Sequence, residues 1–133
     1  MFGYLTGLPA FLSYFVSGLG CFAAFALIYT WITPHKETRL IREGNLAAVV
    51  AFLGALIGFS LPLASAAAHS VSLADFIIWA VIGIALQVLA FYIANLTMKD
   101  LHSKITEGNV AAGLWSGGIA VAIGILNAAC MTY

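Results

Sequence analysis

Charged residues are scarce in this 133-residue sequence, at 8% of the total against 63% hydrophobic residues. A water-soluble domain needs a largely polar surface, so this composition excludes a soluble protein. Five Lys and Arg residues balance five Asp and Glu residues, which gives a formal net charge of zero. Nucleic-acid-binding proteins carry a basic footprint, so nucleic acid is excluded as a partner.

Groups that hold metals or cofactors are also lacking. The two cysteines, Cys21 and Cys130, lie in separate apolar segments without the paired spacing of a metal or redox site. Phosphate-binding loops and nucleotide fingerprints are absent. We therefore expect no cofactor, no metal and no catalytic residue. No basic region precedes the first apolar run, so we expect that run to remain in the mature protein rather than to be cleaved as a signal peptide.

Long apolar segments without Asp, Glu, Lys or Arg make up most of the chain. A helix that crosses the hydrocarbon of a bilayer, about 30 Å thick, needs about 20 residues. Four segments meet this requirement, and they run approximately Pro9–Thr33, Asn45–Ala68, Phe76–Leu96 and Asn109–Met131. The sequence therefore predicts an all-α, polytopic membrane protein with four transmembrane helices, folded as a single membrane domain over residues 1–133.

All five cationic side chains fall in two of the connections between these segments. They are Lys36, Arg39 and Arg42 after the first segment, and Lys99 and Lys104 after the third. Cytoplasmic loops of membrane proteins carry an excess of Lys and Arg. We therefore expect both connections on the cytoplasmic side and both termini on the opposite side.

The chain contains an internal repeat with an offset of 64 residues. The motif Glu43-Gly44-Asn45 recurs as Glu107-Gly108-Asn109, and in each copy two alanines follow after one intervening residue. The repeats cover about residues 9–68 and 76–131, and each holds two spans, so we expect two parallel helical hairpins. The two glycines are suited to end short interfacial helices in the left-handed conformation, and the two asparagines to cap the spans that follow.

The connections should lie on the membrane as short helices. We expect their apolar residues to dip into the membrane interface while the cations face the headgroups. The apolar residues are Leu40, Ile41, Leu101 and Ile105.

Small and polar residues recur at helical spacing in the second and fourth spans. They are Gly54, Gly58, Pro62 and Ser65 in one, and Gly113, Gly117, Gly124 and Asn127 in the other. Small residues let helix backbones approach closely in lipid, so tight packing is the first interpretation and a hydrated path is the second. Pro62 frees the carbonyl of Gly58, and two outcomes are open: the hydroxyl of Ser60 or Ser65 satisfies this carbonyl, or the carbonyl lines a hydrated path.

One cluster at the outer end contains His69, Ser70, Ser72 and Asp75. Ser72 and Asp75 have the spacing of a helix capping box, which predicts a structural role. A catalytic triad needs a nucleophile, a base and an orienting group in one geometry, and a single short loop is a poor place for it.

Several motifs together resemble the YjfL family of small bacterial inner-membrane proteins of unknown function. They are Ile32-Thr33-Pro34-His35, the two Glu-Gly-Asn motifs, Pro62-Leu63-Ala64-Ser65-Ala66 and Asn127-Ala128-Ala129-Cys130-Met131-Thr132. The resemblance covers nearly the whole chain. It implies a multi-pass protein of the bacterial inner membrane, encoded near phage-shock-type membrane-stress proteins and ATP-grasp enzymes.

These observations lead to two hypotheses. The first is a non-enzymatic component that forms homo-oligomers through its small-residue faces and presents its cationic connections to a cytoplasmic membrane-stress protein or to anionic lipid. The second is an oligomeric channel for an ion or small solute, with Gly54, Gly58, Pro62, Gly124 and Asn127 near its path. Four apolar helices enclose little water, so the second hypothesis requires several subunits.

Overall fold

The computed structural model describes residues 6–33 and 37–131, and all regular structure within them is helical. The helices are α2 (Leu8–Ile32), α3 (Glu37–Arg42), α4 (Leu46–His69), α5 (Leu73–Thr97), α6 (Leu101–Thr106) and α7 (Val110–Cys130). The four long helices are each long and apolar enough to cross a membrane. The predicted all-α fold with four transmembrane helices is therefore confirmed. Pro34, His35 and Lys36 lie outside the described residues.

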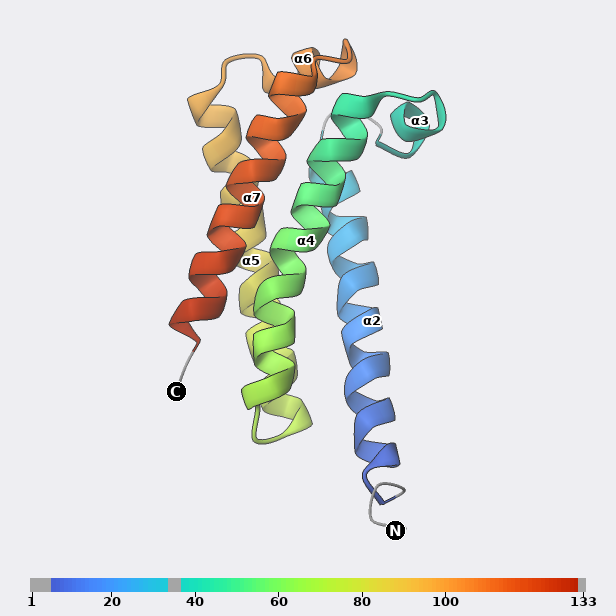
Figure 1. Ribbon diagram of the computed structural model, residues 1–133, viewed down its shortest axis with the longest axis vertical. Coiled ribbons are helices and arrows are strands. Elements are labelled where there is room, and N and C mark those ends of the chain that lie inside the picture. The colour runs from blue at the N-terminus through green and yellow to red at the C-terminus, as the bar shows by residue number, and fades with distance from the viewer. Residues whose placement is uncertain (1–5, 34–36, 132–133) are drawn as a thin grey trace.

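The long helices form an elongated bundle (Figure 1). Along the chain, α2 and α5 run toward the end that carries α3 and α6, whereas α4 and α7 run away from it. We call the end with α3 and α6 the charged end. Helix α2 begins and α7 ends toward the opposite end, and the two stand at opposite edges of the view in Figure 1.

The two short helices end in the same way. Gly44 has φ of +83° and Gly108 has φ of +85°, which is the left-handed conformation that glycine adopts without strain. Asn45 then caps α4 by accepting from the backbone N–H of Ala48, and Asn109 caps α7 in the same manner. The bounds of α3 shifted by 64 residues coincide with those of α6, and the first residue of α4 shifted likewise coincides with that of α7.

The apolar residues of α3 and α6 cover the bundle rather than dip into the membrane interface. Leu40, Leu101 and Ile105 are buried, and they form one cluster with alanines near the charged ends of α4, α5 and α7. The expectation that these three residues face lipid is therefore wrong. At the charged end, α4, α5 and α7 are lined by alanine, which leaves space that Leu and Ile fill.

Aromatic side chains form the second cluster of the core. Phe25 of α2, Phe59 of α4 and Phe76 of α5 are nearly inaccessible, and the rings of Phe25 and Phe59 lie 4.8 Å apart. Only Phe25 and Tyr29 are buried on α2, and both lie in its half nearer the charged end. The other half of α2 is therefore weakly packed against the bundle.

Candidate functional site

The most extensive helix pair in the described structure is α4 with α7. We call this contact the α4–α7 seam. Its centre is built from glycine against glycine, since a Cβ added to Gly54 would overlap the Cα of Gly117. A Cβ on Gly113 would overlap the backbone of Ala47, and one on Gly117 would lie 2.8 Å from the carbonyl oxygen of Val50. The backbones are so close that hydrogen is the only side chain these positions accept.

Pro62 and Gly58 shape the seam further along α4. Pro62 is buried inside the helix and supplies no N–H to the carbonyl of Gly58. That carbonyl lies against Gly124 of α7, where it fills the place of a side chain. A Cα–H group facing a carbonyl oxygen is a weak but favourable contact between membrane helices.

The expectation that a serine satisfies the Gly58 carbonyl is wrong. The hydroxyl of Ser60 donates to the carbonyl of Ile57, at 2.6 Å, within its own helix. The hydroxyl of Ser65 points across the seam to the carbonyl of Ala128, at 3.4 Å. The Gly58 carbonyl instead faces α7, where it lies against Gly124.

Two buried amide side chains adjoin the seam. Gln87 of α5, which is 3% exposed, donates from Nε2 to the carbonyl oxygen of Ala120 at 3.1 Å. Its Oε1 has no hydrogen-bond partner among the described residues, and neither has Nδ2 of Asn127. Gln87 thus links α5 to the seam at the level of Gly58.

The seam positions predicted from the sequence therefore come together in one place. Gly54, Gly58, Gly113, Gly117 and Gly124 are all buried. They meet within a single chain, and the close backbone contact leaves no channel between α4 and α7. Homo-oligomers would have to use other surfaces, because these faces already cover each other.

The charged end is organised around Asn45. Its Nδ2 donates to the carbonyl oxygen of Ile105, at 2.9 Å, and to that of Thr106, at 3.2 Å. One side chain therefore caps the start of α4 with its oxygen and the end of α6 with its nitrogen. Sequence reasoning predicted the first role and missed the second, which joins residues 60 positions apart.

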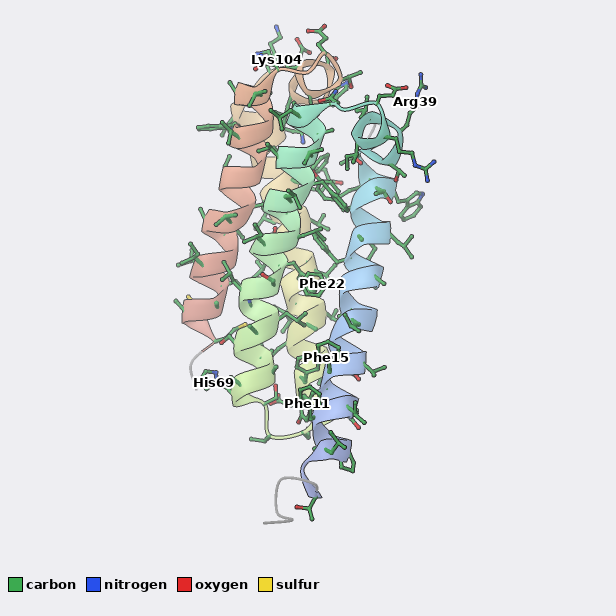
Figure 2. The ribbon with its side chains drawn as sticks, turned by 45° about the vertical axis from the view of Figure 1, so that its right-hand side comes forward. Phe11, Phe15, Phe22, Arg39, His69 and Lys104 are labelled. Carbon is green, nitrogen blue, oxygen red and sulfur yellow. The ribbon has the colours of Figure 1, made fainter. Side chains whose placement is uncertain are left out.

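The cationic side chains that the structure describes lie at the same end of the bundle as Asn45. Arg39, Arg42 and Lys99 are exposed, and Lys104 is partly exposed. Figure 2 shows Arg39 and Lys104 at the charged end and His69 toward the other end. Arg39 Nε pairs with Glu43 Oε1 at 3.1 Å, an exposed pair one helical turn apart. Such a pair contributes little to stability, and it leaves both groups accessible.

In the cluster of His69, Ser70, Ser72 and Asp75, the last two residues form a helix cap at the start of α5. Ser72 Oγ accepts from the backbone N–H of Asp75, and Asp75 Oδ2 accepts from the backbone N–H of Val71, each at 3.1 Å. His69 Nδ1 lies 2.9 Å from the carbonyl oxygen of Ser65. The Asp75 carboxylate therefore holds the turn before α5. Within the described residues, no group of three His, Cys, Asp or Glu side chains could hold a metal ion.

Comparison with known proteins gives consistent matches over the whole chain. The profile of the family described as Domain of Unknown Function (DUF350) matches residues 3–131. The UPF0719 inner membrane protein YjfL of Escherichia coli K12 is 45% identical over 129 residues, which cover 97% of this chain and 98% of that protein. The UPF0719 transmembrane protein YshE of Bacillus subtilis 168 is 26% identical over 119 residues, 88% of this chain and 89% of its own. No solved structure matches.

Proposed function

We propose a function from the premise that this chain belongs to the DUF350 family, whose members include named inner-membrane proteins. The proposed function is that of a non-enzymatic, oligomeric component of the bacterial inner membrane that binds a cytoplasmic partner at its charged end. The resemblance described above makes a membrane-stress protein the expected partner. The names of the relatives carry no enzymatic activity, which fits a binding role.

The distribution of charge is the observation that carries this proposal. Nine of the ten charged residues lie in two segments, 36–43 and 99–107, and Asp75 is the exception. The nine comprise five cations and four anions, so the charged end has nearly balanced charge. An anionic bilayer attracts clustered cations, at about 1 kcal/mol for each Lys or Arg near the surface. Interspersed signs instead favour a protein surface with complementary charges of both signs.

The charged end also has the rigidity of a docking platform. Leu40, Leu101 and Ile105 anchor the short helices in the bundle, and Asn45 ties α6 to the start of α4. Side chains such as Arg42 and Lys99 therefore project from a fixed backbone. A preorganised surface loses less conformational entropy when it binds.

The orientation of the chain is part of the proposal. Placing the charged end in the cytoplasm follows from the bias of Lys and Arg, and it puts both termini in the periplasm. A cytoplasmic partner could then reach α3 and α6 without crossing the bilayer.

The channel hypothesis receives less support. It placed Gly54, Gly58 and Gly124 beside a path, and these residues pack backbone against backbone. A conducting route would therefore have to run between subunits, along surfaces other than the seam.

A photo-crosslinking experiment tests the proposed partner. A photoreactive amino acid replaces the exposed Thr38 or His102 at the charged end, and Val71 at the other end serves as the control. We expect a crosslinked cytoplasmic protein from the first two positions and none from the third. Arg39→Gln with Arg42→Gln should reduce that product several-fold, and the Arg39→Lys, Arg42→Lys pair should retain it. Crosslinks to lipid alone, at every position, would overturn the proposal.

A further inference from the structure

We propose that copies of this chain associate head to tail, which means that two different surfaces of the chain meet. The face of α7 that is turned away from the bundle in one copy packs into the groove between α2 and α4 of the next. The inference rests on the proposed oligomer and on the 64-residue repeat. It names the surfaces and the partner, which is a second copy of the same chain.

Equivalent faces of α4 and α7 differ in burial. On α4, the face formed by Ala47, Gly54 and Gly58 is buried in the seam. The equivalent residues of α7 at the 64-residue offset are Ala111, Gly118 and Ala122, and all three are exposed. A Cβ on Gly118 would meet nothing within 4 Å. The small-residue face of α4 therefore packs against α7, whereas the equivalent face of α7 points outward and is uncovered.

Equivalent faces of α2 and α5 show the reverse difference. On α5, Phe76, Ala80, Gly83 and Gln87 are buried. The equivalent positions on α2 are Leu12, Val16, Leu19 and Ala23, of which the first three are 48%, 64% and 54% exposed. The first helix of the second repeat is covered in part by α4, whereas the first helix of the first repeat has no counterpart to cover it.

An open groove lies beside this face of α2, and Leu19 belongs to both. A cavity of about 570 Å³ between α2 and α4 is lined by Phe11, Phe15, Leu19, Ser60 and Ala64, among others. Ser60 and Ala64 are equivalent to Gly124 and Ala128, two residues of α7 that face α4 in the seam. Figure 2 shows Phe11, Phe15 and Phe22 along this side of α2. The groove is therefore the counterpart, in the first repeat, of the surface that receives α4 in the second.

A polar group points to the same partner. Asn45 donates to the last carbonyls of α6, the short helix of the other repeat. Its equivalent, Asn109, is exposed, and its Nδ2 has no hydrogen-bond partner in the described part of the chain. The equivalent acceptors are the carbonyls of Ile41 and Arg42 at the end of α3. In the head-to-tail arrangement, these belong to the next copy.

The geometry of the bundle allows such a chain of contacts. The two surfaces lie on different sides of the bundle, since α7 and α2 stand at opposite edges of the view in Figure 1. Both copies keep the same orientation in the membrane, because α4 and α7 run in the same direction. A heterologous contact of this kind closes into a ring when its rotation permits. The gain in free energy comes from van der Waals packing of small residues against the groove.

The seam predicts which residues meet between copies. Gly124 faces Gly58 within one chain, so Ala122 of one copy should face Ser60 of the next. The test co-expresses two differently tagged chains, one with Ala122→Cys and one with Ser60→Cys, after replacement of Cys21 and Cys130 by alanine. Oxidation in native membranes should give a disulfide-linked heterodimer. Each single-cysteine chain alone should give none, and neither should Ala122→Cys with Ala85→Cys, an exposed residue of α5.

Two further measurements separate this inference from the proposed oligomer. Light scattering in lipid nanodiscs measures how many copies of the wild type assemble. Gly118→Leu should shift this distribution toward the monomer. Gly20→Leu, at another open position, should leave it unchanged. An oligomer that lacks the Ala122–Ser60 crosslink, or that crosslinks through Ala122→Cys alone, would overturn the head-to-tail arrangement and leave the oligomer standing. A strict monomer in lipid would overturn both.

Discussion

The carbonyl oxygen of Gly58 fills the space beside Gly124 that a side chain would otherwise take. Pro62 removes the amide that would normally hold this carbonyl within α4. The carbonyl instead faces the neighbouring helix at a position where only glycine fits. At this point the seam therefore pairs a carbonyl freed by proline in one helix with a glycine in the other.

Enlarging a seam glycine should destabilise the fold. Gly54→Val places methyl groups where the backbone of Gly117 lies, and overpacking of this kind costs about 2 kcal/mol or more. Thermal unfolding in detergent measures the effect. Gly20→Val is the matched control, because a Cβ at Gly20 meets nothing within 4 Å, and it should unfold like the wild type. Equal stability of the two variants would contradict the close backbone contact.

The two roles of Asn45 can be separated by Asn45→Asp. The carboxylate keeps an acceptor for the start of α4 but loses the donor to Ile105 and Thr106. We expect faster amide hydrogen exchange in α6 and a loss of about 1 to 2 kcal/mol, since the variant also brings an anion close to two carbonyls. Asn109→Asp, studied in monomeric protein, should leave α3 unaffected. Unchanged amide hydrogen exchange in α6 would show that the hydrogen bonds from Asn45 do not stabilise that helix.

Gln87→Leu should have little effect on stability. The change removes one hydrogen bond to Ala120 and also the Oε1 atom that has no partner among the described residues. Interhelical hydrogen bonds in membranes average about 0.6 kcal/mol, and a buried polar atom without a partner costs free energy. We expect the free energy of unfolding to change by less than about 1 kcal/mol in chemical denaturation. A loss of several kcal/mol would indicate a larger polar network around Gln87.

Cysteine labelling should report the orientation in the membrane. Single cysteines at Val71 and His102, both exposed, are introduced after Cys21 and Cys130 are replaced. On intact spheroplasts, a maleimide that cannot cross the membrane should label Val71→Cys at once and His102→Cys only after lysis. The reverse pattern would place the charged end in the periplasm and remove the basis for a cytoplasmic partner.

Much of the fold could be predicted from the sequence because the strongest signals are local. Each span is identified by a run of uncharged residues that is long enough, as a helix, to cross the bilayer. The left-handed glycines and capping asparagines mark where α4 and α7 begin. Such features depend on residues within a few positions of each other. The predicted spans agree with the helices to within three residues at each end.

For the seam and the charged end, the sequence predicts which residues take part but not which of them contact one another. How far α4 is rotated about its axis depends on its neighbours, so the sequence does not predict that the Gly58 carbonyl faces α7 rather than Ser60 or Ser65. The bond from Asn45 to Ile105 joins two repeats, and burial of Leu101 and Ile105 depends on the alanines they meet. These features arise from tertiary packing, which a single sequence does not report directly.

The close packing of the α4–α7 seam predicts that the protein does not conduct ions. Purified wild-type protein is reconstituted in liposomes, and ion flux is measured under salt gradients and applied potentials, with a known channel as the positive control. Asn127→Leu is measured in parallel, after it is shown to remain folded. A protein whose helices meet backbone to backbone should give no flux above that of empty liposomes. Flux in the wild type that Asn127→Leu abolishes would place a conducting path at the seam, contradict its close packing and support the channel hypothesis.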